Sequence, residues 1–190
     1  MALFRTFIAI SVSPEVRKRA RELMNRFRKC GTKVNWSSSE NLHLTVKFLG
    51  DTHDSKIPDV CRGVARAVAE VPPFNASLDH IGAFPSSARP RAVWIGVDEG
   101  QAALQAVQAR IEDEMLAAGF KRERRRYVPH MTIGRVREGG VPQRELGELI
   151  TANAEFSSGT TRVDEVVSMA SFVESKGTTY QVLGRAKLGG

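Results

Sequence analysis

The sequence has few of the features that define the common special classes of protein. Its two cysteines, Cys30 and Cys61, are too few for a disulfide scaffold and lack metal-ligand spacing. No run of about 18 apolar residues occurs, so we expect no membrane span, and the N-terminus does not resemble a secretory signal. Phosphate-binding loops of the Gly-x-x-x-x-Gly-Lys-Ser/Thr and Gly-x-Gly-x-x-Gly kinds are also absent. Because cysteines are few and neither a membrane span nor a secretory signal is expected, we predict a cytoplasmic protein.

The composition is that of an ordinary soluble globular protein with an excess of positive charge. The chain has 190 residues, of which 42% are hydrophobic and 26% are charged. This length predicts that residues 1–190 form one compact domain or two small lobes that share a core. The net charge of +7 makes an anionic partner plausible, with nucleic acid first among the candidates.

Hydrophobic periodicity predicts strands and helices that alternate irregularly along the chain. Ser13 and Pro14 mark the start of the first helix, which Gly31 ends. Further helices are expected at 54–70, 101–118 and 142–150, and strands at 3–11, 33–36, 41–49, 73–84, 91–97, 129–137, 160–173 and 178–187. Because a regular βαβ repeat is missing, we predict the α+β class with mostly antiparallel sheet.

Two of the predicted strands present the same pair of polar side chains. Alternate residues of a strand share a face, so we expect His43, Thr45 and Lys47 to point one way. The opposite, core-facing positions are Leu42, Leu44, Val46 and Phe48. In the second strand His130 and Thr132 share a face, and Met131 and Ile133 are expected to lie opposite.

A pair of histidines suits the cleavage of a phosphodiester. Imidazole has an unperturbed pKa of about 6.5 and can give or take a proton near neutral pH. The reaction needs a base for the attacking oxygen and an acid for the leaving oxygen, on opposite sides of phosphorus. His43 and His130 fit these roles, and the hydroxyls of Thr45 and Thr132 are suited to bind the nonbridging phosphate oxygens.

One such motif alone is more often a half-buried histidine hydrogen-bonded within a sheet. The repetition of the motif, which uses two of the four histidines, favours catalysis. His53 and His80 are expected at the surface. The basic run 121–126 has two interpretations, a solvated loop or an electrostatic guide for RNA.

These motifs resemble those of the two-histidine phosphoesterase superfamily, and most closely the bacterial and archaeal RNA 2′,3′-cyclic phosphodiesterases, also called 2′-5′ RNA ligases. The family is marked by two His-apolar-Thr-apolar motifs, here residues 43–46 and 130–133. The likeness covers nearly the whole chain and includes Phe7-Ile8-Ala9-Ile10, Phe48-Leu49-Gly50, Gly82-Ala83-Phe84-Pro85, Arg91-Ala92-Val93-Trp94 and Phe172-Val173-Glu174-Ser175.

The resemblance implies a bilobal α+β fold with two antiparallel sheets around a central cleft, helices outside and approximate two-fold internal symmetry. It implies hydrolysis of RNA 2′,3′-cyclic phosphate ends to 2′-phosphomonoesters without metal or other cofactor, and in some relatives reversible 2′,5′ ligation. We assign His130 as the base and His43 as the acid, although the symmetry of the motifs leaves the reverse order open.

The resemblance also suggests substrate contacts outside the two motifs. Tyr127 is a candidate to stack on a base, with packing as the alternative. Arg135 resembles a family arginine that contacts phosphate or neighbouring structure, although strict alternation turns it away from His130. Lys47 is a third candidate substrate-binding residue because it is expected on the His43 face.

Several other functions remain open. The same fold could act on 2′,5′-oligoadenylate or on ADP-ribose cyclic phosphate. A non-catalytic RNA-binding module is a rival from another class, although such sheets usually present aromatic side chains for stacking. A metal-dependent hydrolase is disfavoured because no cluster with ligand spacing appears. We expect RNA or a nucleotide with a cyclic phosphate end as partner, no metal, no membrane and a monomer.

Overall fold

The computed structural model describes residues 2–137, 143–175 and 177–189. Its helices are α1 (Pro14–Phe27), η1 (Ser39–Asn41), η2 (Asp54–Lys56), α2 (Ile57–Val68), α3 (Gln101–Ala117) and α4 (Arg144–Ala152). Its strands are β1 (Leu3–Ser11), β2 (Val34–Trp36), β3 (His43–His53), β4 (Phe74–Asp79), β5 (Ile81–Ser86), β6 (Arg89–Gly96), β7 (His130–Val136), β8 (Ser157–Val163), β9 (Glu165–Glu174) and β10 (Gly177–Lys187).

The strands form two four-stranded sheets and a two-stranded ribbon. One sheet has the order β10-β9-β1-β3, the other has the order β2-β7-β6-β5, and β4 pairs with β8. The registered strand pairs in the described residues are antiparallel. The predicted α+β class with antiparallel sheets is therefore confirmed, and the ribbon is an addition to the two expected sheets.

The order of elements along the chain repeats. The series β1-α1-β3-α2-β4-β5 is followed by β6-α3-β7-α4-β8-β9, with β2 and β10 as additions. Each series gives its last strand to the other sheet, because β5 pairs with β6 and β9 pairs with β1. Each four-stranded sheet therefore contains strands from both series. A two-fold relation in space and a central cleft remain predictions.

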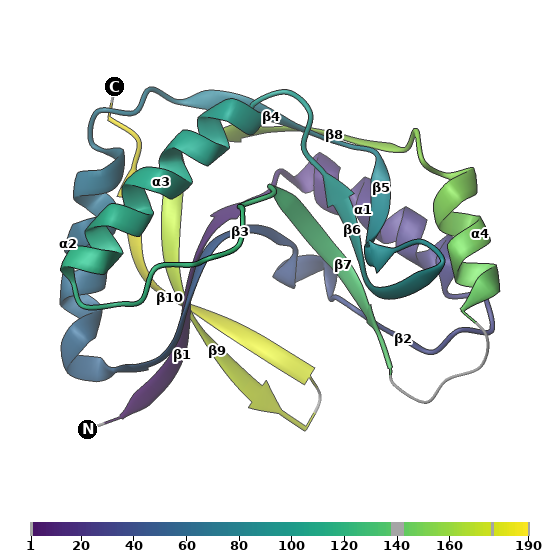
Figure 1. Cartoon of the computed structure of the whole chain (residues 1–190), viewed down its shortest axis with the longest axis horizontal. Coiled ribbons are helices and arrows are strands. Elements are labelled where there is room, and N and C mark those ends of the chain that lie inside the picture. Colours follow the sequence, from purple (N-terminus) through teal and green to yellow (C-terminus); the bar gives the residue numbers. More distant parts are fainter. Residues whose placement is uncertain (1, 138–142, 176, 190) are drawn as a thin grey trace.

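The helices lie at the two ends of the molecule, and the histidine strands lie in its middle (Figure 1). Helices α2 and α3 pack on each other at one end of the molecule, beside the sheet that contains β1. Helices α1 and α4 lie toward the other end, where β2 and β5 are found. Strands β3 and β7 contact each other where the two sheets adjoin. This arrangement brings the two predicted motifs to the junction of the sheets.

One hydrophobic core connects both sheets. It contains Ile8 and Leu44 from the first sheet and Ile95 and Ile133 from the second, all of them fully buried. A smaller cluster of Phe7, Ala9 and Val167, with Met169 and Tyr180, lies on the opposite face of β1, β9 and β10. The side chains of His43 and Thr45 belong to that second face.

Two predicted strands are each divided in the structure. The expected strand 73–84 is broken at His80, whose φ of 49° is in the left-handed region. Its first part, β4, joins the ribbon, and its second part, β5, joins β6. The expected strand 160–173 is also divided, into β8, which joins the ribbon, and β9, which joins β1. The prediction was wrong here because the chain passes from the ribbon into a four-stranded sheet without an interruption of the hydrophobic pattern.

Candidate active site

The two histidine strands contain a bulge at equivalent positions. The register between β1 and β3 slips by one residue at Val46, and that between β6 and β7 slips at Ile133. A bulge inserts one unpaired residue, so the side chains that follow it change face. As a result, the third residue after each threonine, Phe48 or Arg135, returns to the face that carries the histidine.

His43 is held at both ring nitrogens. Its Nδ1 lies 2.6 Å from the carbonyl oxygen of Asn41 and its Nε2 lies 3.0 Å from Oγ1 of Thr45. A carbonyl can only accept, so Nδ1 carries a proton and donates it. Nε2 is then the nitrogen that can exchange a proton with a ligand. Burial lowers the pKa of His43 below its ordinary value, and the hydrogen bond to Asn41 opposes this shift.

His130 is oriented in the same way. Its Nδ1 lies 2.7 Å from the carbonyl oxygen of Val128, two residues earlier, as Asn41 is for His43. Among the described residues, Nε2 of His130 has no hydrogen-bond partner, in contrast to that of His43. Burial lowers the pKa of His130, the bond to Val128 raises it, and the positive charge of Arg135 lowers it further.

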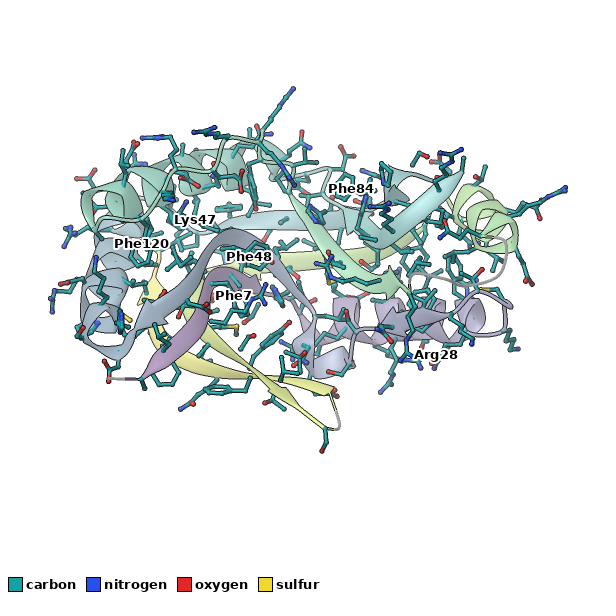
Figure 2. All side chains as sticks on the ribbon, turned by 60° about the horizontal axis from the view of Figure 1, so that its bottom comes forward. Phe7, Arg28, Lys47, Phe48, Phe84 and Phe120 are labelled. Carbon is teal, nitrogen blue, oxygen red and sulfur yellow. The ribbon has the colours of Figure 1, made fainter. Side chains whose placement is uncertain are left out.

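Aromatic side chains surround His43. The ring centroids of Phe7 and Tyr180 lie 5.0 Å and 5.4 Å from that of the imidazole. Phe48 lies 6.2 Å from Phe7 and is 66% exposed (Figure 2). The prediction that Phe48 enters the core is wrong because the bulge at Val46 reverses its direction. An exposed phenyl ring beside a candidate catalytic histidine offers a surface for stacking.

A second aromatic group borders His130. Phe84 and Trp94 have ring centroids 5.1 Å and 6.3 Å from His130 and 5.2 Å from each other. Trp94 lies directly opposite Thr132 in the register of β6 and β7. Each histidine therefore has its own apolar surroundings, which explains the desolvation of both rings.

Arg135 lies on the face of His130, contrary to the expectation from strict alternation. The bulge at Ile133 turns the exposed Arg135 toward the histidine. Its charge acts on the pKa of His130 and also on that of Tyr180, which burial raises. Since Tyr180 contacts His43, the guanidinium lies within electrostatic range of both sides of the candidate site.

Lys47 does not share the face of His43 and Thr45, and this prediction is wrong. The bulge directs its side chain inward, where 3% of it is exposed. Nζ lies 2.8 Å from both carboxylate oxygens of Glu112 on α3 and donates to the carbonyl oxygen of Lys121. The ammonium is occupied inside the protein, so the structure argues against Lys47 as a substrate-binding residue.

Tyr127, three residues before His130, contacts the backbone of the first motif. Its hydroxyl donates to the carbonyl oxygen of Thr45 at 3.1 Å, and burial raises the pKa of this hydroxyl. The ring packs against the main core. Of the two interpretations of Tyr127, packing agrees with these contacts. The run 121–126 that precedes it is exposed.

The two other histidines have no equivalent setting. His53 is exposed at the end of β3, and His80 is exposed between β4 and β5. The His80 ring covers Gly96, where a β-carbon would lie 2.3 Å from Nε2, and meets Trp94 edge-on. Gly96 is opposite His130 in the register. His80 therefore borders the candidate site. The sequence around His80 did not predict this position.

In the described part of the chain, no group of three or more His, Cys, Asp or Glu side chains is placed to hold a metal ion. No described helix is long and apolar enough to cross a membrane. The site instead combines two imidazoles with free or exchangeable Nε2 atoms, two threonine hydroxyls and one guanidinium. These groups can move protons and bind an anion.

Comparison with known proteins relates most of the chain to one family. A family model described as the 2′-5′ RNA ligase superfamily matches residues 37–171. The chain is 34% identical over 179 residues to an RNA 2′,3′-cyclic phosphodiesterase of Thermotoga maritima, covering 94% of this chain and 92% of that protein. A protein of the same name from Methanothermobacter thermautotrophicus is 31% identical over 176 residues, covering 93% and 94% of the two chains.

Solved structures share the fold. The E. coli protein LigT, crystallised with 3′-AMP, superposes with a TM-score of 0.78 at 24% identity, covering 98% of this chain and 99% of that chain. TT0787 of Thermus thermophilus has a TM-score of 0.74 at 25% identity, covering 98% of each chain. The arrangement of sheets and helices described above is therefore found in both proteins.

Proposed function

Because the chain belongs to the 2′-5′ RNA ligase superfamily, we propose that it hydrolyses RNA 2′,3′-cyclic phosphate ends to 2′-phosphomonoesters without a metal ion. The family expected from the sequence is thereby confirmed. The observation that carries the proposal is the matched pair His43 and His130, each with Nδ1 bonded to a carbonyl two residues earlier. Both rings keep Nε2 for proton transfer.

In the proposed reaction, water attacks phosphorus opposite the bond to the ribose 3′-oxygen. Nε2 of His130 takes a proton from the water as the new P–O bond forms. The bond between phosphorus and the 3′-oxygen breaks, and Nε2–H of His43 protonates the leaving oxygen. The product keeps the phosphate on the 2′-oxygen, and one water is consumed. The strained cyclic ester supplies the activation, so no nucleotide cofactor takes part.

The surroundings of the histidines favour His130 as the base. Burial lowers the pKa of His130 and the charge of Arg135 adds to this shift, which favours an unprotonated Nε2 that can accept a proton. In neutral His43, Nε2 accepts from the hydroxyl of Thr45, and this contact fixes the direction in which Nε2–H points once the ring is protonated. Burial lowers the pKa of His43 in the free protein. A bound anionic phosphodiester has the opposite effect and restores the protonated acid.

The charge that develops on the nonbridging oxygens needs donors. We assign this role to Thr45, Thr132 and Arg135, which share the faces of the two histidines. A guanidinium presents paired N–H donors that match two phosphate oxygens. Phe48 is suited to stack on the terminal base, because its ring is exposed next to the aromatic group around His43.

The same chemistry admits a second acceptor. If an RNA 5′-hydroxyl replaces water, the same transfer of protons gives a 2′,5′ linkage. We therefore propose 2′,5′ ligation as a secondary activity, after hydrolysis. 2′,5′-Oligoadenylate and ADP-ribose cyclic phosphate are the alternative substrates. A panel of these compounds with cyclic-phosphate RNA, compared by kcat/KM, separates them.

The first experiment measures turnover of RNA with a 2′,3′-cyclic phosphate end in excess EDTA. We expect the parent protein to produce the 2′-phosphate, and we expect His43→Ala and His130→Ala to lower kcat by about 10²-fold or more because each loses a proton-transfer group. Chromatography against 2′- and 3′-phosphate standards identifies the product. His53→Ala, at an exposed position away from the motifs, is the matched control and should retain parental activity.

Inactivity of the parent on every cyclic end would point to a non-catalytic RNA-binding module. Equal activity of the parent and both histidine variants would contradict the proposed histidine mechanism. Loss of activity in EDTA that Mg²⁺ or Zn²⁺ restores would replace the metal-free mechanism with a metal-dependent one.

A further inference from the structure

A basic cavity lies apart from the two histidines, where the chain leaves α1 and enters β2. Its volume is about 370 Å³. It is lined by Arg28, Thr32, Lys33, Val34, Trp36 and Arg137. Among these described residues are three cationic side chains and no carboxylate. Such a composition suits an anion.

The three cations are available for a ligand. In the described part of the chain, none of Arg28, Lys33 and Arg137 forms an ion pair. Nε of Arg137 donates to Oδ1 of Asn35 at 2.6 Å, which fixes the start of the guanidinium group and leaves its two terminal nitrogens. The three positive charges line one cavity without an ion pair to any described residue, and a bound anion would reduce their repulsion.

A buried hydroxyl in the cavity lacks a partner. Thr32 is 7% exposed, and its Oγ1 has no hydrogen bond to any described residue. Leaving a buried polar group unpaired is unfavourable, and native structures rarely do so without a reason. Donation to a phosphate oxygen would satisfy this hydroxyl, and the charge of the phosphate would balance the three cations.

Strand β7 connects the cavity to the catalytic residues. It begins at His130, passes Arg135, and Arg137 follows directly after its end. Arg137 bonds to Asn35, which is opposite Arg135 in the register, so both arginines lie on the histidine face. Seven residues of strand span roughly 23 Å, farther than one nucleotide extends. Figure 2 shows β7 running toward the side of the molecule where Arg28 lies.

We propose that this cavity binds a backbone phosphate of the RNA several nucleotides upstream of the cyclic end. The proposal rests on the proposed function and specifies its substrate class, because it makes oligonucleotide ends better substrates than cyclic mononucleotides. RNA then follows the face of β7 from the histidines, past Arg135, to the cavity.

The test compares two substrates with the same cyclic end: an octanucleotide and a mononucleotide. We expect Lys33→Glu and Arg28→Glu each to raise KM for the octanucleotide about tenfold and to leave kcat/KM for the mononucleotide within about twofold. The logarithmic salt dependence of octanucleotide binding should become shallower by about 0.7 for each phosphate that the variant no longer neutralises. Thr32→Val, which removes only the hydroxyl, should weaken octanucleotide binding about fivefold.

The matched control is Arg110→Glu, which makes the same charge change at an exposed position of α3. If this variant weakens octanucleotide binding as much as Lys33→Glu does, the effect is one of net charge and the cavity is not a site. Octanucleotide kinetics unchanged in the three cavity variants also overturn the proposal. Binding of the 2′-phosphorylated product octanucleotide, measured by fluorescence anisotropy, tests the cavity even if turnover is absent. The failure of catalysis and the failure of this site are thus separate results.

Discussion

At the scale of single residues, the two histidines have the same orientation but different neighbours. Nδ1 of each ring is bonded to a carbonyl, whereas Nε2 meets Thr45 in one case and no described protein group in the other. The charge of Arg135 adds a further difference, because it lowers the pKa of His130 and is not among the causes that shift the pKa of His43. Similar motifs can therefore divide the acid and base roles between them.

This difference predicts a change in pH dependence when Arg135 is replaced. Arg135 lowers the pKa of His130, so Arg135→Gln raises it, and the unprotonated base then forms only at higher pH. We expect the acidic limb of the kcat/KM profile to move to higher pH, together with a loss of about 10²-fold at the optimum because a phosphate donor is removed. Steady-state rates across the acidic, neutral and mildly alkaline range measure both effects.

Arg135→Lys separates the two contributions, because it keeps the positive charge but loses the paired donors. Its acidic limb should stay near that of the parent while the rate still falls. An unshifted limb in the glutamine variant would show that the arginine has no influence on the catalytic base.

At the scale of strands, the sequence predicts each motif correctly up to its last apolar residue, Val46 or Ile133, both of which are buried in the core, and no further. Alternation correctly groups His43 with Thr45 and His130 with Thr132. It fails for Lys47, Phe48 and Arg135, because the bulges at Val46 and Ile133 shift the period by one residue. Gly134 gave a signal for the second bulge, since an isolated glycine in a strand often marks one. No comparable signal precedes Lys47.

The inward turn of Lys47 has its own physical reason. The buried ammonium has the carboxylate of Glu112 and the carbonyl of Lys121 as partners, and Gln108 and the amide of Glu123 also bond the carboxylate. A buried pair is tolerable only when its remaining hydrogen bonds are satisfied. These partners lie 65 and 74 positions away along the chain, so no local pattern could reveal them.

The bulge at Val46 also yields a prediction for Phe48. Because its ring is exposed on the histidine face, we expect Phe48→Ala to raise KM for a cyclic-phosphate RNA about tenfold through the loss of base stacking. The effect on kcat should be small, since the ring does not take part in proton transfer. Phe48→Trp keeps a stacking surface and should retain the parental KM. If the Phe48 ring only stabilised the fold, Phe48→Ala would lower the thermal stability and leave KM unchanged.

At the scale of the whole molecule, the exchange of strands explains why two lobes are expected to behave as one domain. The last strand of each repeated series completes the sheet of the other, since β5 pairs with β6 and β9 with β1. The buried side chains of both sheets form one continuous cluster. Half of the chain would leave a sheet incomplete and a core surface exposed, so residues 1–190 should unfold together.

Unfolding of an Ile8→Ala variant tests this cooperativity. Ile8 is fully buried in the first sheet, and its truncation should lower the free energy of unfolding by about 2–5 kcal/mol. Both tryptophans, Trp36 and Trp94, lie in the second sheet. Their fluorescence therefore reports on a part of the molecule that the substitution does not touch. In a single cooperative unit, the urea midpoint measured by fluorescence should decrease by the same amount as that measured by circular dichroism. An unchanged fluorescence midpoint, with a lower midpoint in circular dichroism, would mean that the two lobes unfold independently.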